Sequence, residues 1–296
     1  MDKPAGWTSH DVVARIRRLA GTRRAGHAGT LDPMATGVLV VGVGKATRLL
    51  GHLALAEKEY LATVRLGQAT DTGDAEGTVI AGAPAASLRT DQVRAAAAGL
   101  TGDIQQVPPA ISAIKVGGKR SYRLAREGAA PVLAARPVTV RVFTVAELRR
   151  AGDGLLDVDV RVVCSSGTYV RALARDLGET LGVGGHLTML RRTRAGPYGL
   201  AMARTLGQLA ASFTVIPLAD AVAAAFPSRR LAAGQAAALS HGAALTVTGP
   251  PVPPRGPAGS APGQSGLVAA FAPDGTFIAL TEERDGRARP VAVFVP

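Results

Sequence analysis

Residues 24–37 have the sequence Arg-Ala-Gly-His-Ala-Gly-Thr-Leu-Asp-Pro-Met-Ala-Thr-Gly, and Val-Leu-Val-Val follows at 38–41. The first stretch combines one carboxylate (Asp32), one imidazole (His27) and three glycines, a composition that predicts a loop. The apolar, largely β-branched run behind it predicts a buried strand. Because loops held by rigid strands commonly carry binding and catalytic residues, this stretch is the first candidate for a functional site.

The composition of the whole chain sets the class of protein. Its 296 residues allow one large domain, or a large domain and a small one, and a hydrophobic content of 47% is enough for a sizeable core. No apolar run approaches the roughly 20 residues of a membrane span, and the N-terminus does not resemble a signal peptide. Cys164 is the single cysteine, which excludes an internal disulfide and a multi-cysteine metal site. We therefore expect a soluble, cytoplasmic protein with no contact to a membrane.

The positive charge of the chain is unevenly distributed. Residues 1–200 hold 27 lysines and arginines against 17 acidic residues, a net charge of +10, whereas residues 201–296 hold 7 against 5, a net charge of +2. A general bias toward alanine, glycine and arginine would explain a preference for arginine over lysine, but not this confinement to one part of the chain. The distribution indicates a polyanion as partner, with nucleic acid as the natural candidate.

Local patterns predict the main elements of the first two hundred residues. Thr8 and Asp11 have the spacing of a capping box, and the apolar residues that follow lie on one face of a helix that ends at Gly21. Residues 59–67 alternate and predict a strand. Residues 71–77 carry several carboxylates but lack the spacing of a calcium loop, so a plain polar loop is expected there.

Two further strands are predicted at 138–145 and 155–163, paired around a Gly-Asp-Gly turn, and Thr90 is the expected N-cap of a short helix that ends near Gly99. The second of these strands runs through Ser-Ser-Gly-Thr into a helix with Arg171 in its first turn. Such a strand-to-helix turn leaves backbone N–H groups free for a ligand.

An insertion at about 103–136 has a different composition. Lys115, Lys119, Arg123 and Arg126 recur at a spacing of three to four residues with Tyr122 among them. We call these five residues the basic stripe. It suits a phosphate backbone and a stacked base or sugar, although an ordinary charged helix surface is the alternative. Arg191 belongs to a second basic cluster, at 190–194.

The last third of the chain predicts a small β-rich domain. An alanine-rich helical region begins at about 216, and residues 249–263 are dense in proline, glycine and serine, as in a flexible linker or disordered loop. Residues 267–271 and 276–280 predict a hairpin, and residues 291–295 a third strand.

Three common catalytic patterns fail on this sequence. Residues 42–47 (Gly-Val-Gly-Lys-Ala-Thr) superficially resemble a nucleotide phosphate loop, but Leu39 stands where its first glycine belongs and Ala46 where the magnesium-binding hydroxyl belongs. Ser165 and Ser166 lack the glycine-flanked turn of a hydrolase nucleophile. The five histidines have no metal-ligand spacing, so we expect no metal site.

The residues that remain match a known family. Five motifs occur in order along the chain: Lys3-Pro4, the run 26–37, Lys58-x-Tyr60, Ser112-Ala113-x-Lys115 and Ser166-Gly167-Thr168-Tyr169-x-Arg171. They closely resemble the motifs of the TruB family of bacterial tRNA pseudouridine synthases, which isomerise uridine 55 in the T arm of tRNA. The resemblance covers roughly residues 2–200, and residues 29–37 are its most specific part.

The resemblance implies a role for each matching residue. Asp32 corresponds to the nucleophile, which attacks either C6 of the uracil or C1′ of the ribose, and the resemblance implies that the reaction uses no metal and no other cofactor. Tyr60 corresponds to a residue that stacks on the target base and helps to remove the C5 proton, and Arg171 to one that pairs with the nucleophile. His27 matches the position that packs where the flipped-out base has left its stack. Tyr169 and Leu190 match substrate-contacting positions.

We therefore expect an α+β protein with the pseudouridine synthase fold, a mixed and largely antiparallel sheet with flanking helices. The catalytic domain is predicted at 1–215, with an RNA-binding thumb at about 103–136, and a small PUA-like β domain at 216–296. The expected partner is the T-arm stem-loop of tRNA, bound by a monomer that needs no other protein. A catalytically silent RNA-binding or tRNA-folding protein is the alternative, because it would keep the basic stripe without needing Asp32, Tyr60 and Arg171 together.

Overall fold

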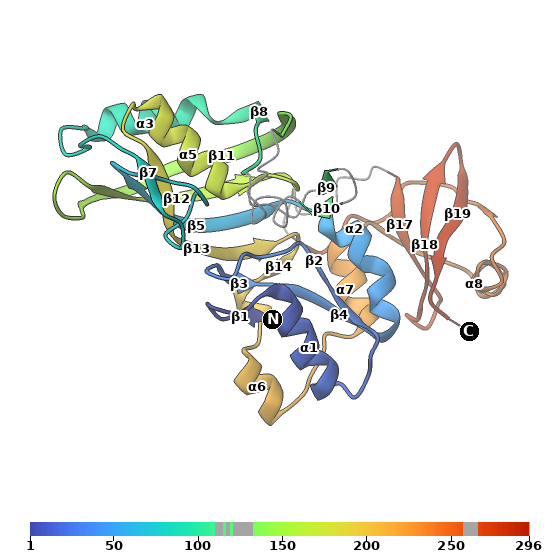
Figure 1. Cartoon of the computed structure of the whole chain (residues 1–296). Coiled ribbons are helices and arrows are strands. Elements are labelled where there is room, and N and C mark those ends of the chain that lie inside the picture. Colours follow the sequence, from blue (N-terminus) through green and yellow to red (C-terminus); the bar gives the residue numbers. More distant parts are fainter. Residues whose placement is uncertain (110–114, 117–118, 121–132, 257–265, 296) are drawn as a thin grey trace. The chain divides into compact units, whose positions relative to one another are not determined.

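The computed structural model describes residues 1–109, 115–116, 119–120, 133–256 and 266–295 (Figure 1). The chain forms two compact units. Unit 1 comprises Met1–Lys58 together with Arg194–Pro296, and unit 2 comprises Glu59–Thr193. The division into domains predicted at residue 215 follows a different line and stays a prediction.

The N-terminal part of unit 1 contains residues 24–41, with Asp32 and His27 among them. Helix α1 (Ser9–Leu19) begins with the predicted capping box, in which the backbone N–H of Asp11 donates to Thr8 Oγ1 and that of Thr8 to Asp11 Oδ2. Two antiparallel strand pairs follow, β1 (Asp2–Lys3) with β3 (Thr36–Val38) and β2 (Ala25–Ala28) with β4 (Val40–Val43).

The prediction for residues 24–41 was wrong in two respects. His27 lies on strand β2 and not on a loop, and the expected single strand at 38–41 is divided between β3 and β4. The glycines in β2 and β4 explain why the sequence pattern did not predict that these strands pair. A Cβ at Gly42 would lie 3.0 Å from the backbone oxygen of Ala46, and one at Gly26 would lie 3.1 Å from Leu50 Cδ1. Gly42 leaves room for the backbone of Ala46, and Gly26 leaves room for the Leu50 side chain.

The rest of unit 1 carries short helices and a five-stranded sheet in the order β15-β17-β18-β19-β16. The predicted hairpin and third strand are confirmed as β17, β18 and β19. The elements are η1 (Gly44–Leu49), α2 (Leu50–Ala54), β14 (Tyr198–Gly199), η2 (Leu200–Met202), α6 (Leu206–Ala211), α7 (Leu218–Ala225), β15 (Ser228–Arg230), α8 (Ala233–Ser240), β16 (Leu245–Thr246), β17 (Leu267–Phe271), β18 (Phe277–Arg284) and β19 (Arg287–Val293).

One core joins the two chain segments of unit 1. Phe226, Phe277 and Phe294 form a cluster of buried residues with Val38 from β3 and Leu49 from η1. The side chain of Arg48 lies over the Phe294 ring, 5.9 Å from its centroid, and also donates to the carbonyl of residue 293. Burial of large apolar side chains is the dominant stabilising term in folding, so the C-terminal strands and the N-terminal segment stabilise each other.

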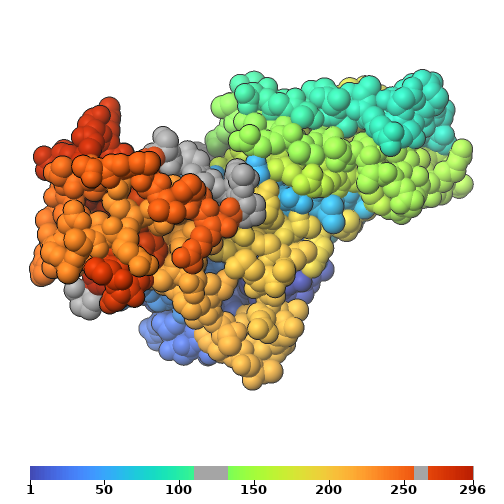
Figure 2. All heavy atoms as spheres, turned by 180° about the vertical axis from the view of Figure 1, so that it is seen from behind, coloured from blue at the N-terminus to red at the C-terminus, as the bar shows by residue number. Residues whose placement is uncertain are grey.

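Unit 2 is built on a sheet with the strand order β13-β5-β12-β11-β8 (Figure 1). The predicted paired strands are confirmed as β11 and β12, which extend further than expected and contain two register shifts. Helix α3 packs against α5 and β11, and it forms part of the teal surface in Figure 2. The elements are β5 (Lys58–Leu66), β6 (Ala69–Thr70), β7 (Val79–Ala81), α3 (Thr90–Gly99), β8 (Gly102–Gln106), β9 (Lys115–Val116), β10 (Lys119–Arg120), β11 (Arg136–Arg150), β12 (Leu156–Cys164), α5 (Val170–Thr180) and β13 (Gly185–Ala195).

Helix α3 corrects one detail of the prediction. Arg89, not Thr90, is the N-cap, and Thr90 is the first helical residue. The backbone N–H of Arg89 donates to Gln92 Oε1 at 2.9 Å, so the side chain at the third helical position satisfies the N–H of the N-cap residue.

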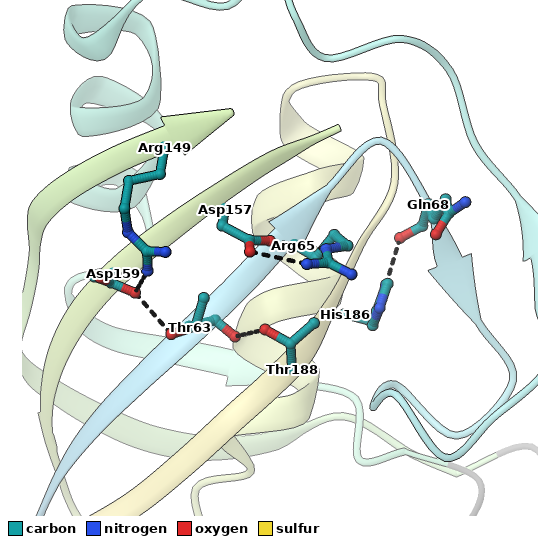
Figure 3. Close-up of polar contacts among 8 residues, drawn as sticks. All are labelled: Thr63, Arg65, Gln68, Arg149, Asp157, Asp159, His186 and Thr188. Carbon is teal, nitrogen blue, oxygen red and sulfur yellow. Dashed lines mark hydrogen bonds and ion pairs between the residues drawn. The ribbon is translucent and has the colours of Figure 1, made fainter. Parts of the chain in front are cut away.

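Polar side chains connect the strands of unit 2 across one face of the sheet (Figure 3). Arg149 on β11 donates to Asp159 on β12 at 2.6 Å, and Thr63 on β5 donates to the same carboxylate at 2.7 Å. Burial acts to raise the pKa of Asp159, but the hydrogen bonds from Arg149 and Thr63 outweigh it and hold the pKa below its ordinary value. Arg65 and Asp157 form a second pair between β5 and β12, at 2.8 Å. Strand β5 is thereby fixed in register with its neighbours.

Candidate active site

Asp32 lies on a short loop of unit 1, residues 29–35, which we call the Asp32 loop. Gly29 begins the loop and Gly37 lies just beyond it in β3, and the two adopt φ values of 78° and 100° that other residues rarely adopt. The backbone N–H of Ala35 donates to the carbonyl of Asp32 at 3.1 Å and closes a turn. Asp32 itself is half-buried, so its carboxylate belongs to a structured turn that still reaches solvent.

Buried polar groups hold this loop on both sides of Asp32. Before it, Leu31 is hydrogen-bonded through both its N–H and its C=O to the hydroxyl of Ser9, at 2.9 and 3.1 Å. After it, the carbonyl of Pro33 accepts from the backbone N–H of Gly6 at 2.9 Å and from Lys3 Nζ at 3.1 Å. Lys3 is fully buried, and its ammonium also donates to two further backbone carbonyls, those of residues 4 and 7.

His27 belongs to the same unit, on strand β2 opposite Val41. Its ring lies edge-on to that of His10 in the first turn of α1, with 5.6 Å between the ring centroids and 83° between the ring planes. An edge-to-face contact is a favourable geometry for two aromatic rings. The N-terminal turn of α1 therefore contacts the β2 strand as well as the Asp32 loop.

Arg171 lies in unit 2, in the first turn of α5 as predicted, and its side chain is only 5% exposed. Its Nη1 donates to the carbonyl of Thr72 at 2.8 Å and lies 3.6 Å from Asp74 Oδ2. A guanidinium is rarely buried unless it is paired. Asp74 is one such partner for this buried charge.

Sequence reasoning missed Asp74, because the acidic segment 71–77 was expected to be a plain polar loop. Asp74 is 4% exposed, and its Oδ1 accepts from Thr72 Oγ1 at 2.6 Å and from the backbone N–H of Glu76 at 3.2 Å. One signal was available: Arg171 stands among the apolar residues of an amphipathic helix, and a buried arginine requires a carboxylate. Nothing in the sequence indicated which carboxylate that is.

Tyr169 immediately precedes α5, and a second buried side chain fixes it. The backbone N–H of Tyr169 donates to Gln106 Oε1 at 2.8 Å, and Gln106 Nε2 donates back to the carbonyl of Tyr169 at 3.1 Å. Gln106 is 2% exposed. Since a buried amide must satisfy both its oxygen and its nitrogen, this pairing fixes the start of the helix that carries Arg171.

Tyr60 and Leu190 lie on neighbouring strands of unit 2, β5 and β13. Tyr60 is 7% exposed and Leu190 is 6% exposed. Side chains alternate between the two faces of a strand, so Tyr60 shares a face with Ala62 and Val64, opposite to the face that carries Thr63. The sheet thus holds an aromatic ring and an aliphatic side chain on adjacent strands.

The predicted RNA-binding residues are placed less completely. Lys115 and Lys119 lie on the paired strands β9 and β10, and Arg191 is half-buried on β13. Tyr122, Arg123 and Arg126 lie outside the described residues. Within the ranges that the structure covers, no group of three or more histidine, cysteine or acidic side chains could hold a metal ion. Among the helices described, none is both long enough and apolar enough to span a bilayer.

The predicted site residues are divided between the two units: His27 and Asp32 lie in unit 1, and Tyr60, Tyr169, Arg171, Leu190 and Arg191 lie in unit 2. The pairing of Asp32 with Arg171 stays a prediction. Within each unit the backbone of the site residues is fixed. Buried polar side chains hold the backbone beside Asp32 in unit 1 and the start of the helix that carries Arg171 in unit 2.

Comparison with known proteins connects these parts to one family. Residues 17–170 match the model of the TruB family pseudouridylate synthase N-terminal domain. Residues 171–220 match the tRNA pseudouridylate synthase B C-terminal domain, and residues 226–295 match the C-terminal model of tRNA pseudouridine synthase II.

Curated proteins and solved structures agree with these models. The chain is 61% identical to a tRNA pseudouridine synthase B of Thermobifida fusca over 99% of this chain and 97% of that protein, and 56% identical to one of Streptomyces avermitilis over 99% and 95%. A structure of an H/ACA RNP bound to a substrate RNA containing 2'-deoxyuridine includes a chain with 28% identity and a TM-score of 0.72, covering 100% of this chain and 84% of that one. A Cbf5-Nop10-Gar1 complex gives 26% identity and a TM-score of 0.68 over the same shares. With the Asp32 loop and the buried Arg171 in their expected elements, the chain belongs to the TruB family of pseudouridylate synthases.

Proposed function

We propose that this protein isomerises uridine 55 in the T arm of tRNA to pseudouridine, with Asp32 as the nucleophile. Relatives named tRNA pseudouridine synthase B share 61% and 54% of its residues over nearly the whole chain, which supports the reaction and the substrate. One structural observation carries the choice of nucleophile. Asp32 is a half-buried carboxylate whose backbone is hydrogen-bonded on both sides, at Leu31 and at Pro33.

The proposed reaction needs only groups that the chain supplies. The Asp32 carboxylate adds to uracil C6 or to ribose C1′, and the bond between C1′ and N1 breaks. The base rotates, a bond forms between C1′ and C5, the C5 proton leaves, N1 takes up a proton, and the carboxylate is released unchanged. A carboxylate suits this sequence because it both adds to the substrate and departs from it. No net oxidation takes place, so no redox partner is required.

Arg171 and Tyr60 complete the proposed site. A guanidinium beside a carboxylate favours its ionised form, so pairing of Arg171 with Asp32 would keep the nucleophile charged and aimed. Tyr60 would stack on the uracil and assist removal of the C5 proton. Tyr169 and Leu190 would contact the same nucleotide.

Flipping the base out of its stack costs a few kcal/mol. Stacking on an aromatic side chain contributes about 1–3 kcal/mol per base, so Tyr60 would offset much of this cost. His27 would fill the place that the base has left. Such recognition fits a splayed RNA loop better than a duplex groove, because side chains cannot enter the deep, narrow major groove of A-form RNA.

The wider contacts of the proposed complex follow from the charge of the chain. The insertion at about 103–136, which carries the basic stripe, would grip the T arm as a thumb, and the region 216–296 would add PUA-like contacts. We expect the protein to act as a monomer in the cytoplasm without another protein. The solved Cbf5-Nop10-Gar1 complex contains two further proteins, which is a property of that complex.

Tritium release tests the proposal. A T-arm stem-loop transcript labelled with tritium at C5 of uridine should release its label with the parent protein and not with Asp32→Asn. Release by Asp32→Asn at the parent rate would refute Asp32 as the nucleophile. A parent protein that binds the transcript and releases no tritium would instead indicate a catalytically silent tRNA-binding or tRNA-folding protein.

A further inference from the structure

We infer that Ser9 is a positioning residue for the nucleophile: its buried hydroxyl fixes the backbone beside Asp32. This inference rests on the proposed role of Asp32. Ser9 is the first residue of helix α1, 22 positions before Leu31. It is 1% exposed, so its hydroxyl is removed from solvent and must find its partners within the protein.

The Ser9 hydroxyl serves both backbone groups of a single residue. It accepts from the N–H of Leu31 at 2.9 Å and donates to the C=O of Leu31 at 3.1 Å. The side chain of Leu31 is also buried, at 3% exposure. A strand partner would normally satisfy such a pair of backbone groups. One hydroxyl replaces that partner here and fixes the peptide planes on both sides of Leu31.

A second set of hydrogen bonds, to the carbonyl of Pro33, holds the backbone on the other side of Asp32. On the far side of the carboxylate, the carbonyl of Pro33 accepts from Gly6 and from the buried ammonium of Lys3. The turn between the anchors is closed by the hydrogen bond from Ala35 to the carbonyl of Asp32. The backbone of Asp32 is thereby held on both sides of the residue that carries the carboxylate. Such preorganisation matters because a displacement of about 1 Å at a reacting group costs about a hundredfold in rate.

Ser9→Ala is the direct test. The variant leaves both backbone groups of Leu31 without the hydroxyl, so the Asp32 loop is expected to shift while the RNA-binding surface stays intact. We expect the single-turnover rate of tritium release to fall on the order of ten- to a hundredfold. The Kd for the T-arm transcript should stay within about twofold of the parent value. A purely structural role for Ser9 would not separate the rate from the affinity in this way.

Thr8→Ala provides the matched control. Thr8 caps the same helix through Asp11, and losing such a cap costs about 1 kcal/mol of stability, but Thr8 does not hydrogen-bond to the Asp32 loop in the contacts described above. We expect Thr8→Ala to lower Tm and to keep the parent rate. An equal loss of rate in Thr8→Ala and Ser9→Ala would overturn the inference, as would a Ser9→Ala protein with the parent rate.

Two further variants keep the test decisive. Ser9→Cys retains the volume with a weak donor and acceptor, so it should fold even where Ser9→Ala does not, with a rate below that of the parent and unchanged tRNA affinity. The parent rate in Ser9→Cys together with unfolded Ser9→Ala would make the hydroxyl a folding requirement only and refute the inference. Asp32→Asn distinguishes a failure of the Asp32 assignment from a failure of the Ser9 assignment. Tritium release by Asp32→Asn would refute Asp32 as the nucleophile. An inactive Asp32→Asn protein together with a fully active Ser9→Ala protein would refute only the role of Ser9.

Discussion

At the scale of single residues, the contact between Arg171 and Asp74 makes a prediction about stability and activity. Both side chains are almost fully buried, and removing one partner of a buried ion pair costs about 3–5 kcal/mol. Because the carbonyl of Thr72 also binds Arg171, we expect Asp74→Asn to lower the free energy of unfolding by about 3 kcal/mol, the lower end of that range. Tritium release should fall as well, since the guanidinium loses an anchor. Urea unfolding and the tritium assay measure the two effects.

Asp71→Asn is the control for that substitution. Asp71 lies in the same loop and is exposed, and its carboxylate accepts only a backbone hydrogen bond from Thr78, at 2.8 Å, in the contacts described. The amide oxygen of asparagine still accepts this hydrogen bond, so the free energy of unfolding should fall by less than about 1 kcal/mol, and the rate should not change. If Asp74→Asn unfolds at the parent urea concentration and retains the parent rate, Asp74 neither stabilises nor orients Arg171.

Residue-level prediction from the sequence is possible where a residue belongs to a long contiguous motif. Asp32 is recognisable because eleven neighbouring residues accompany it in the run 26–37, and Arg171 because it follows Ser-Gly-Thr-Tyr. Ser9, Asp74 and Gln106 carry no such signal. Their function lies in contacts with residues 22, 97 and 63 positions away, and separations of that kind are set by tertiary packing.

At the scale of elements, helix α5 must approach the start of β13 closely for Arg171 to hold its place. A Cβ on Gly178 would lie 2.2 Å from the backbone of Gly184 and of Gly185, nearer than atoms can pack. Gly178→Ala should therefore push the helix away and destabilise the protein by at least about 3 kcal/mol, the size of other severe overpacking effects.

Gly234→Ala in helix α8 is the control substitution, because nothing lies within 4 Å of a Cβ placed on Gly234. It should raise stability by up to about 1 kcal/mol. Thermal unfolding compares the two, and equal Tm values would contradict the packing argument.

The elements themselves were predictable to the extent that their signals are local. The capping box of α1 and the alternation of β11 and β12 depend on neighbouring residues, and the structure confirms both. Strand β2 was missed because Ala-Gly-His-Ala has no strand propensity of its own. It forms because β4 pairs with it and because Gly26 and Gly42 let α2 and its preceding turn approach the backbone.

At the scale of the whole molecule, the path of the chain could not be predicted from composition. A change of composition along the sequence predicts a boundary at residue 215, and that division stays a prediction. Compact unit 1 combines residues 1–58 with the chain from Arg194 onward, and Phe226, Phe277 and Phe294 share a core with Val38 and Leu49. Which distant segments share a core depends on shape complementarity between buried side chains, and neither hydropathy nor charge encodes that.

The charge of the whole molecule carries the last prediction, which concerns tRNA binding. Residues 1–200 hold a net charge of +10, and each phosphate that a lysine or arginine neutralises adds about 0.7–0.9 to the slope of log K against log salt concentration. Replacing Lys115, Lys119, Arg123 and Arg126 together by glutamine should weaken binding at low salt and reduce the slope by about 3, if each residue contacts one phosphate.

Asp32→Asn is the control for the fourfold variant, because it should abolish turnover and keep the parent slope. Filter binding of the T-arm transcript from 50 to about 300 mM salt covers the range in which counterion release dominates. A fourfold variant with the parent slope would show that the basic stripe is a solvated surface, and the RNA would then be held by other basic residues of the chain.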